Sequence, residues 1–188
     1  ADAGDGQGSS NASRVAQATA LRDWLPTVTE QGDAVALLGD FNSYGMEDPL
    51  QVLYTDGFTN VDTAFDGVGY SYSFQGLSGS LDHVLLNEAA LERATGADIW
   101  NINSGESIAL EYSRYLNHGT DFFAEGPYRS SDHDPVVVGM SAGAGEVAPE
   151  GPVDLSLLNI NDFHGRIDAN TVKFAGTVEQ QRAEVEGA

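Results

Sequence analysis

The sequence contains no cysteine and no long apolar run, and each absence excludes a class of structure. Without cysteine the chain has no disulfide bond and no thiolate metal site. No stretch approaches the roughly 18 consecutive apolar residues that a membrane-spanning helix needs, so we expect no membrane span. The lack of cysteine does not separate a cytoplasmic from an exported protein.

Basic residues are also scarce, which limits how the chain can bind polyanions. There are 8 Lys and Arg residues against 29 Asp and Glu residues, a net charge of −21. A basic face is therefore excluded as the main source of affinity for nucleic acid, because too few cations exist to neutralise phosphates. Most of the acidic charge fits the well-solvated surface of a secreted or salt-adapted protein. A few carboxylates are candidates for holding divalent cations that screen a phosphate.

The 188 residues are expected to form one partial domain, a linker and the start of a second domain. Residues 1–140 carry the first domain, and residues 141–152, rich in Gly, Pro and small side chains, read as a linker. A new apolar strand begins at Val153, but residues 153–188 are too few for an independent core. The polar, Gly-rich opening is neither a signal peptide nor a plausible native start, which predicts a segment of a longer protein.

Apolar periodicity predicts a mixed α/β arrangement in the first domain. A helix capped by Asn11 or Ser13 should end near Leu25, and a second should open at Asp48-Pro49 and run to about Tyr54, because proline suits the first helical position. Strands are expected at residues 34–39, 71–76, 81–87, 98–102 and 136–140. The first and last of these strands should be buried on both faces, and a Gly/Ser turn should separate the second from the third.

A few bulky or polar side chains are expected to have packing roles. Trp24 and Trp100 should lie in the core or be partly buried, rather than serve as stacking platforms for bases. His83 should pack in the interior.

Three polar tips follow apolar strands, and together they hold the groups that phosphodiester hydrolysis requires. They are Asp40 with Asn42, then Asp82, then Asp132 with His133. Asp40 and Asn42 are two apart, so on an extended backbone both would point the same way and could hold a water and a phosphate oxygen. Residues at strand ends often converge on one site.

The chemistry assigns a role to each type of side chain. A histidine suits the general base near neutral pH, and a carboxylate commonly fixes its tautomer. A divalent cation with hard oxygen ligands offsets charge on the transition state, which favours Mg²⁺ or Ca²⁺.

The motifs GDFNS, LDHVLLN and SSDHDPVVV, in this order, resemble the C-terminal half of the endonuclease/exonuclease/phosphatase superfamily, which has the DNase I-like fold. The resemblance covers roughly residues 10–140. It implies that Asp40 and Asn42 act at the scissile phosphate, that Asp82 orients the catalytic His133, and that Asp132 lies near the metal. The segment before GDFNS is similar to that of secreted bacterial nucleases of the ExeM/NucH type. This implies an extracellular, periplasmic or cell-surface location, DNA or another nucleic acid as substrate, and Mg²⁺ or Ca²⁺.

The chain departs from that family's pattern in one respect. The family's first half carries a metal-binding Glu, an Asn and a His-containing strand, none of which is in this chain, and Glu47 does not replace the Glu because it follows GDFNS. We therefore expect the isolated segment to be inactive.

A second motif, LSLLNINDFHGRID, resembles the opening of a 5′-nucleotidase of the calcineurin-like metallophosphoesterase superfamily. The resemblance implies that Asp162 and His164 bind a pair of divalent metals such as Mn²⁺ or Zn²⁺, with a nucleotide as substrate.

The expected fold is therefore α/β: half of a two-sheet DNase I-like sandwich with flanking helices, then a linker and the first strand-helix piece of a metallophosphoesterase domain. The expected function is metal-dependent hydrolysis of nucleic acid. Two alternatives stay open. One is another phosphoesterase of the same fold, either a phosphomonoesterase or a sphingomyelinase-like enzyme. The other is a catalytically incomplete piece that serves only a structural or interaction role.

Overall fold

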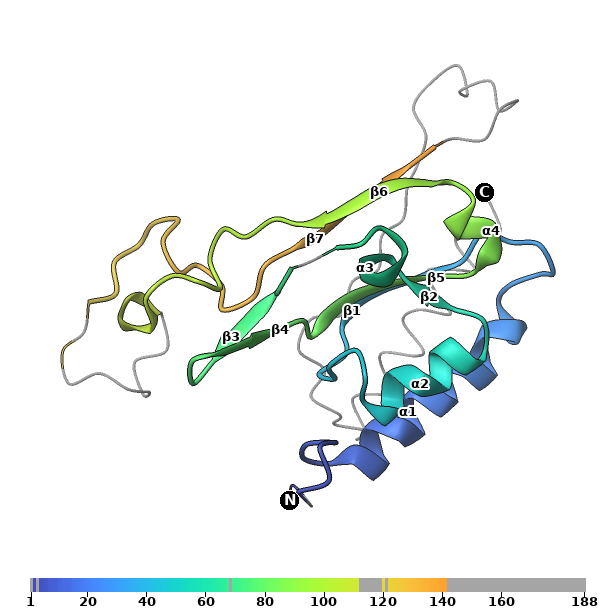
Figure 1. Ribbon diagram of the computed structural model, residues 1–188, viewed down its shortest axis with the longest axis horizontal. Helices are drawn as coiled ribbons and strands as arrows, with labels where there is room; N and C mark the ends of the chain where they lie inside the picture. The colour runs from blue at the N-terminus through green and yellow to red at the C-terminus, as the bar shows by residue number, and fades with distance from the viewer. Residues whose placement is uncertain (1, 3, 68, 112–119, 121, 142–188) are drawn as a thin grey trace, which may run out of the picture. The chain divides into compact units, whose positions relative to one another are not determined.

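The computed structural model describes residues 2, 4–67, 69–111, 120 and 122–141 (Figure 1). All of them belong to the first of two compact units, Ala1–Gly145. The expected linker beyond Ser141 lies outside the described residues, and so does the second domain with Asp162 and His164. No helix in the described ranges is long and apolar enough to cross a membrane.

The described part is a mixed α/β structure built from three small antiparallel sheets. The largest has the order β1-β5-β2. Two further pairs are a hairpin, β3 with β4, and the pair β6 with β7. The strands are β1 (Ala36–Asp40), β2 (Thr59–Asn60), β3 (Tyr72–Phe74), β4 (Leu77–Gly79), β5 (Asp82–Leu86), β6 (Ala94–Ile99) and β7 (Val136–Met140). The helices are α1 (Asn11–Trp24), α2 (Asp48–Thr55), α3 (Val61–Ala64) and α4 (Glu88–Leu91), with 3₁₀ turns η1 (Leu25–Thr27) and η2 (Ile108–Leu110).

The central strand β5 separates two apolar clusters, because its side chains alternate between the two faces of the sheet. Leu85 packs with Leu37 and with the buried leucines of α2, beneath α1. Val84 and Leu86 pack on the other side, against Val136 and Val138 of β7 among others. In Figure 1 the helix pair and the β6–β7 pair accordingly lie on opposite sides of β1 and β5. The polar ends of β1 and β5 are thus held by packing on both faces of β5.

The expectation that two apolar runs are buried on both faces is wrong. In β1 only Leu37 is buried, and Leu38 is 64% exposed. Leu38 is exposed because β1 is an edge strand that pairs only with β5, and the helices cover only the face that carries Leu37. On the other face, β7 packs over β5. In β7, Val137 is exposed because only one face of this two-stranded sheet is covered, the face of Val136 and Val138.

The segment expected to be a turn before Leu81 is instead the strand β4. It pairs with β3 in a tight hairpin whose turn is Gln75-Gly76, both with positive φ. The expected strand at residues 71–76 is therefore shorter, and it pairs with β4. The weaker strand expected at residues 98–102 begins earlier, as β6.

The second helix is confirmed, with Pro49 in its first turn. The first helix is confirmed as well, but neither Asn11 nor Ser13 caps it. The cap is Ser10, which has φ 60° and makes no side-chain cap hydrogen bond. Neither tryptophan lies in the core: Trp24 is partly buried, at 46% exposed, and Trp100 is 63% exposed.

Candidate active site

Two carboxylates face each other where the β1–β5 ladder ends. Asp40 is the last residue of β1 and Asp82 the first of β5, and the antiparallel register pairs them directly. Directly opposed residues in such a ladder have Cβ atoms about 5 Å apart, and like charges in this arrangement are destabilising. The register therefore concentrates negative charge at one end of the sheet.

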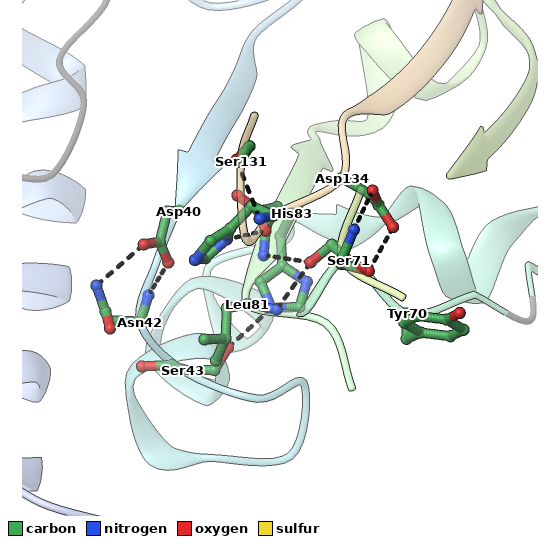
Figure 2. Close-up of polar contacts among 12 residues, drawn as sticks. Asp40, Asn42, Ser43, Tyr70, Ser71, Leu81, His83, Ser131 and Asp134 are labelled. Carbon is green, nitrogen blue, oxygen red and sulfur yellow. Dashed lines mark hydrogen bonds and ion pairs between the residues drawn. The ribbon is translucent and has the colours of Figure 1, made fainter. Parts of the chain in front are cut away.

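His133 joins this pair from the loop before β7. Its Nδ1 lies 2.6 Å from Oδ2 of Asp82. One potential ligand atom from each of Asp40, Asp82 and His133 lies within 4.8 Å of the other two. The backbone of His133 is fixed by a bridge to Tyr72 and by donation of its N–H to Oγ of Ser131 at 3.0 Å. Three segments far apart in the sequence thus meet at one point (Figure 2).

The contact with Asp82 defines the protonation state that His133 favours. A carboxylate can only accept, so Nδ1 of His133 carries the proton and donates it, which leaves Nε2 as the atom that can accept another proton. The hydrogen bond to Asp82 raises the pKa of His133 above its usual 6.5, burial opposes this, and the charges of Asp82, Asp40 and Asp132 raise it further. The imidazole is therefore basic and fixed in one tautomer.

Asn42 reaches Asp40 through a turn. The extended backbone expected between them is wrong, because Asn42 has φ 47°. Its N–H donates to Oδ1 of Asp40 at 2.7 Å and its Nδ2 to Oδ2 at 3.1 Å (Figure 2). This is the Asx-type turn that Asp forms readily after a strand. It brings the Asn42 amide to the Asp40 carboxylate by a different route from the one expected.

Arg14 of α1 holds the loop that carries Asn42, and sequence reasoning missed it. Its Nη1 donates to the carbonyl oxygen of Asn42 at 2.9 Å and to Oγ of Ser43 at 2.7 Å, and it also pairs with Glu47. Its other nitrogens donate to carbonyl oxygens in the segment before α1. No sequence signal marks this role, because most of its partners are backbone carbonyls. Glu47 is held in this ion pair.

The buried carboxylate of Asp134 fixes the loop that carries His133, and sequence reasoning did not identify this role. Its Oδ1 accepts from the N–H groups of Ile102, Asn103 and Ser104 at 2.8–3.1 Å, and its Oδ2 accepts from the Asn101 amide and the Ser104 hydroxyl. Burial alone would raise its pKa, but hydrogen bonds from Ser104, Asn101 and Asn103 outweigh this and lower it to about 2. At neutral pH the carboxylate is therefore an anion, and its hydrogen bonds connect two loops.

Ser71, also buried, links this anchor to Asp82. Its Oγ accepts from the N–H groups of Leu81 and Asp82 at 3.2 and 3.1 Å. Its carbonyl oxygen accepts from the N–H of Asp134 at 2.7 Å (Figure 2). The backbones on both sides of the His133–Asp82 contact are thus held by one small side chain and its peptide group.

His83 lies in the interior as expected, with both ring nitrogens engaged. Nε2 lies 2.8 Å from the carbonyl oxygen of Ser43, so it must be the donor there, and Nδ1 accepts from the amide of Asn60 at 3.0 Å. Burial lowers the pKa of His83, and only weaker opposing effects raise it. His83 is therefore a neutral packing residue that supports the Asn42–Ser43 loop.

Asp132 is half-buried beside His133 but is not part of the close group of three. Among the described residues, Asp40, Asp82 and His133 are the one set of three side chains that could hold a metal ion together. Two carboxylates with an imidazole suit a divalent cation, and hard oxygen donors suit Mg²⁺ or Ca²⁺. Nδ1 of His133 is occupied by Asp82, so oxygen atoms would supply most of the coordination.

Comparisons of this chain with protein-family models, with curated proteins and with solved structures found no match. The chemistry of the site must therefore be argued from its own geometry.

Proposed function

We propose that residues 1–140 belong to a metal-dependent phosphodiesterase domain of the endonuclease/exonuclease/phosphatase superfamily, with a DNase I-like sandwich, and that it hydrolyses DNA or another nucleic acid outside the cell. The support is the ordered set of three motifs, whose polar residues come from the ends of β1 and β5 and from the loop before β7. The mixed α/β architecture is compatible with such a sandwich.

The observation that carries the proposal is the contact between His133 and Asp82, with Asp40 directly across the ladder. A carboxylate that accepts from one imidazole nitrogen leaves the other nitrogen free to take a proton from water, and it stabilises the imidazolium that forms. Two adjoining carboxylates provide the negative charge that attracts a divalent cation.

In this proposal His133 is the general base, and Asp82 holds its tautomer. Asp40 positions the attacking water, and the Asn42 amide donates to a phosphate oxygen. Asp132 helps to hold a cation, Mg²⁺ or Ca²⁺, which when bound stabilises the charge that develops on the phosphorus centre. For residues 153–188 we propose the start of a 5′-nucleotidase-like domain, in which Asp162 and His164 bind a divalent pair such as Mn²⁺ or Zn²⁺ and the substrate is a nucleotide. That part of the proposal rests on the sequence motif alone.

The test is cleavage of DNA by the natural full-length protein that contains these residues, with and without Mg²⁺ or Ca²⁺. His133→Ala should lower the rate by about 10²–10⁴-fold, the usual contribution of a general base. Added free imidazole should restore part of the activity, because it can occupy the space that the side chain leaves. Undiminished, metal-dependent cleavage by His133→Ala would remove the proposal.

Two further arms sharpen this test. Asp82→Asn should also lower the rate, while Asp23→Asn, an exposed carboxylate paired with Arg22, is the matched control for loss of one charge. A panel of DNA, RNA, nucleoside monophosphates and sphingomyelin separates a nuclease from a phosphomonoesterase or a lipid phosphodiesterase. Hydrolysis of sphingomyelin or monophosphates with no cleavage of nucleic acid would assign the site to one of those alternatives.

A further inference from the structure

The β3–β4 hairpin next to the site has one polar and one apolar face. Ser73 and Ser78 are paired across the strands, with their hydroxyl oxygens 3.2 Å apart. The opposite face carries Tyr72 and Phe74 on β3 and Leu77 on β4, because side chains alternate along each strand.

This apolar face is exposed to solvent. Phe74 is 50% and Leu77 76% exposed, and neither belongs to the two apolar clusters of the core. In Figure 1 the hairpin projects beyond the ends of β1 and β5, the end that carries Asp40 and Asp82. An exposed apolar face beside a reactive group is a common mark of a binding surface.

Three aromatic rings lie on this face, and one of them contacts the imidazole of the proposed base. The Tyr72 ring lies 4.7 Å from the imidazole of His133, and the Phe74 ring lies 6.2 Å beyond it, nearly parallel to it at 14°. Tyr44 lies against Gly79, which is the residue opposite Tyr72 in the hairpin. A Cβ atom at Gly79 would approach the Tyr44 ring to 2.7 Å, so the ring can lie here only because residue 79 has no side chain. We call Tyr44, Tyr72 and Phe74 the aromatic platform.

The charges of the described residues oppose binding through phosphates. The described ranges contain four arginines and no lysine, and two of them, Arg14 and Arg129, donate to backbone carbonyls inside the fold. Arg22 is paired with Asp23. Apart from the exposed Arg93 and any bound cation, these described residues offer a nucleic acid little cationic surface, which favours affinity from contacts that do not depend on charge. Stacking of bases on aromatic rings is such a contact, and it requires bases whose faces are accessible.

From this geometry we infer that the aromatic platform stacks an unpaired nucleobase adjacent to the scissile phosphate, so that the chain prefers single-stranded or locally opened nucleic acid to intact duplex. The inference rests on the proposed function and names its substrate class. A lipid surface fits the hairpin less well, because its tip is Gln75-Gly76, which is polar, and the rings lie along its length towards His133.

The experiment measures binding of labelled oligonucleotides to the natural full-length protein by fluorescence anisotropy. One single strand carries all its bases, a second of equal length and charge is abasic, and a third is duplex. The strand with bases should bind more tightly than the other two. Phe74→Leu, which keeps an apolar side chain but removes the ring, should weaken binding of that strand by about tenfold. It should leave binding of the abasic strand unchanged.

Two controls distinguish stacking from simple burial of apolar area. Phe74→Trp keeps an aromatic face and should retain the affinity, whereas Leu77→Ser removes apolar area from the facing position and should have little effect. Equal binding of the three oligonucleotides, absence of binding to all of them, or equal losses in Phe74→Leu and Leu77→Ser would overturn the inference. Binding to sphingomyelin vesicles that is lost in Phe74→Leu would also overturn it, in favour of a lipid partner.

Failure of this inference is distinguishable from failure of the proposed function. If the protein cleaves DNA through His133 but binds single strands and duplex equally, the proposed nuclease function is supported and the stacking site is refuted. If it binds single strands through Phe74 and cleaves no phosphodiester, the platform stands and the proposed chemistry fails.

Discussion

Replacement of Asp134 by Asn should destabilise the fold by an amount that the structure allows us to work out. The hydrogen bonds from residues 101–104 hold the pKa of this buried carboxyl at about 2, against 3.8 in the absence of the fold. Each pKa unit corresponds to about 1.36 kcal/mol, so the native contacts favour the ionised form by about 2.5 kcal/mol. In the variant side chain an NH₂ group replaces one of the two accepting oxygens. This NH₂ would face another donor, either the Asn101 amide or a backbone N–H, and both groups would lack an acceptor.

The expected cost of Asp134→Asn at neutral pH is about 2–4 kcal/mol, or a fall in melting temperature of roughly 7–14 °C for a domain of this size. Thermal and urea unfolding followed by circular dichroism measure both quantities. Asp132→Asn is the matched control, because it removes the same charge two residues away and lies outside the Asp134 network. We expect it to change stability by less than about 1 kcal/mol.

The pH dependence provides a second, independent signature. The folded pKa of Asp134 is below the unfolded one, so its contribution is fully present above pH 3.8 and is lost as pH falls from 3.8 towards 2. The stability difference between the wild type and Asp134→Asn should therefore shrink over this interval. A difference that stays constant down to pH 2, or equal stability of Asp134→Asn and Asp132→Asn at pH 7, would refute the reasoning.

Two further predictions concern the supports of the site. Arg14→Met should destabilise the fold by about 3–5 kcal/mol and release the Asn42 loop, because Glu47 and several carbonyl oxygens would lose their hydrogen-bond donor. Its control, Arg22→Met, removes an exposed ion pair and should cost about 1 kcal/mol or less in the same urea titration. Gly79→Ala should cost about 1–3 kcal/mol, because its Cβ would displace the Tyr44 ring. The Cβ atom added by Gly96→Ala would contact nothing within 4 Å, so this change should destabilise the fold much less. Equal losses of stability in the two variants would contradict the close packing of Tyr44 on Gly79.

The sequence indicated the elements whose signals are local. Asp48-Pro49 predicts the start of α2 because proline suits only the first turn of a helix, and α2 begins there. The sequence also predicts that the polar tips follow apolar strands and converge. Asp40, Asp82 and His133 do converge, but only Asp40 ends a strand, whereas Asp82 begins β5 and His133 precedes β7.

The features that could not be predicted depend on contacts between distant segments. The turn Gln75-Gly76 lacks the Asn-Gly or Asp-Gly signature of two-residue hairpins, so β4 was read as a turn. Asp134 could not be predicted because most of its partners are backbone N–H groups 30 or more residues away. Arg14 could not be predicted because its partners combine nearby carbonyl oxygens with groups of the distant loop at residues 42–47, and any residue can supply a backbone group. Burial of β1 was overestimated because an apolar run does not reveal which strand lies at an edge.

The register of β1 and β5 is the strongest argument that this end of the sheet was shaped by function. A ladder that ended in Asp opposite Lys, or in Thr opposite Thr, would be more stable than one that ends in Asp40 opposite Asp82. The fold retains this repulsion with Asp132 nearby, while His133 donates from Nδ1 to Asp82 at 2.6 Å and keeps Nε2 as its basic nitrogen. Positions where a chain keeps a locally unfavourable choice are commonly functional sites. The same carboxylates that repel each other raise the pKa of the imidazole and, in the proposed function, would attract a cation, so the cost in stability and the proposed chemistry would have one electrostatic origin.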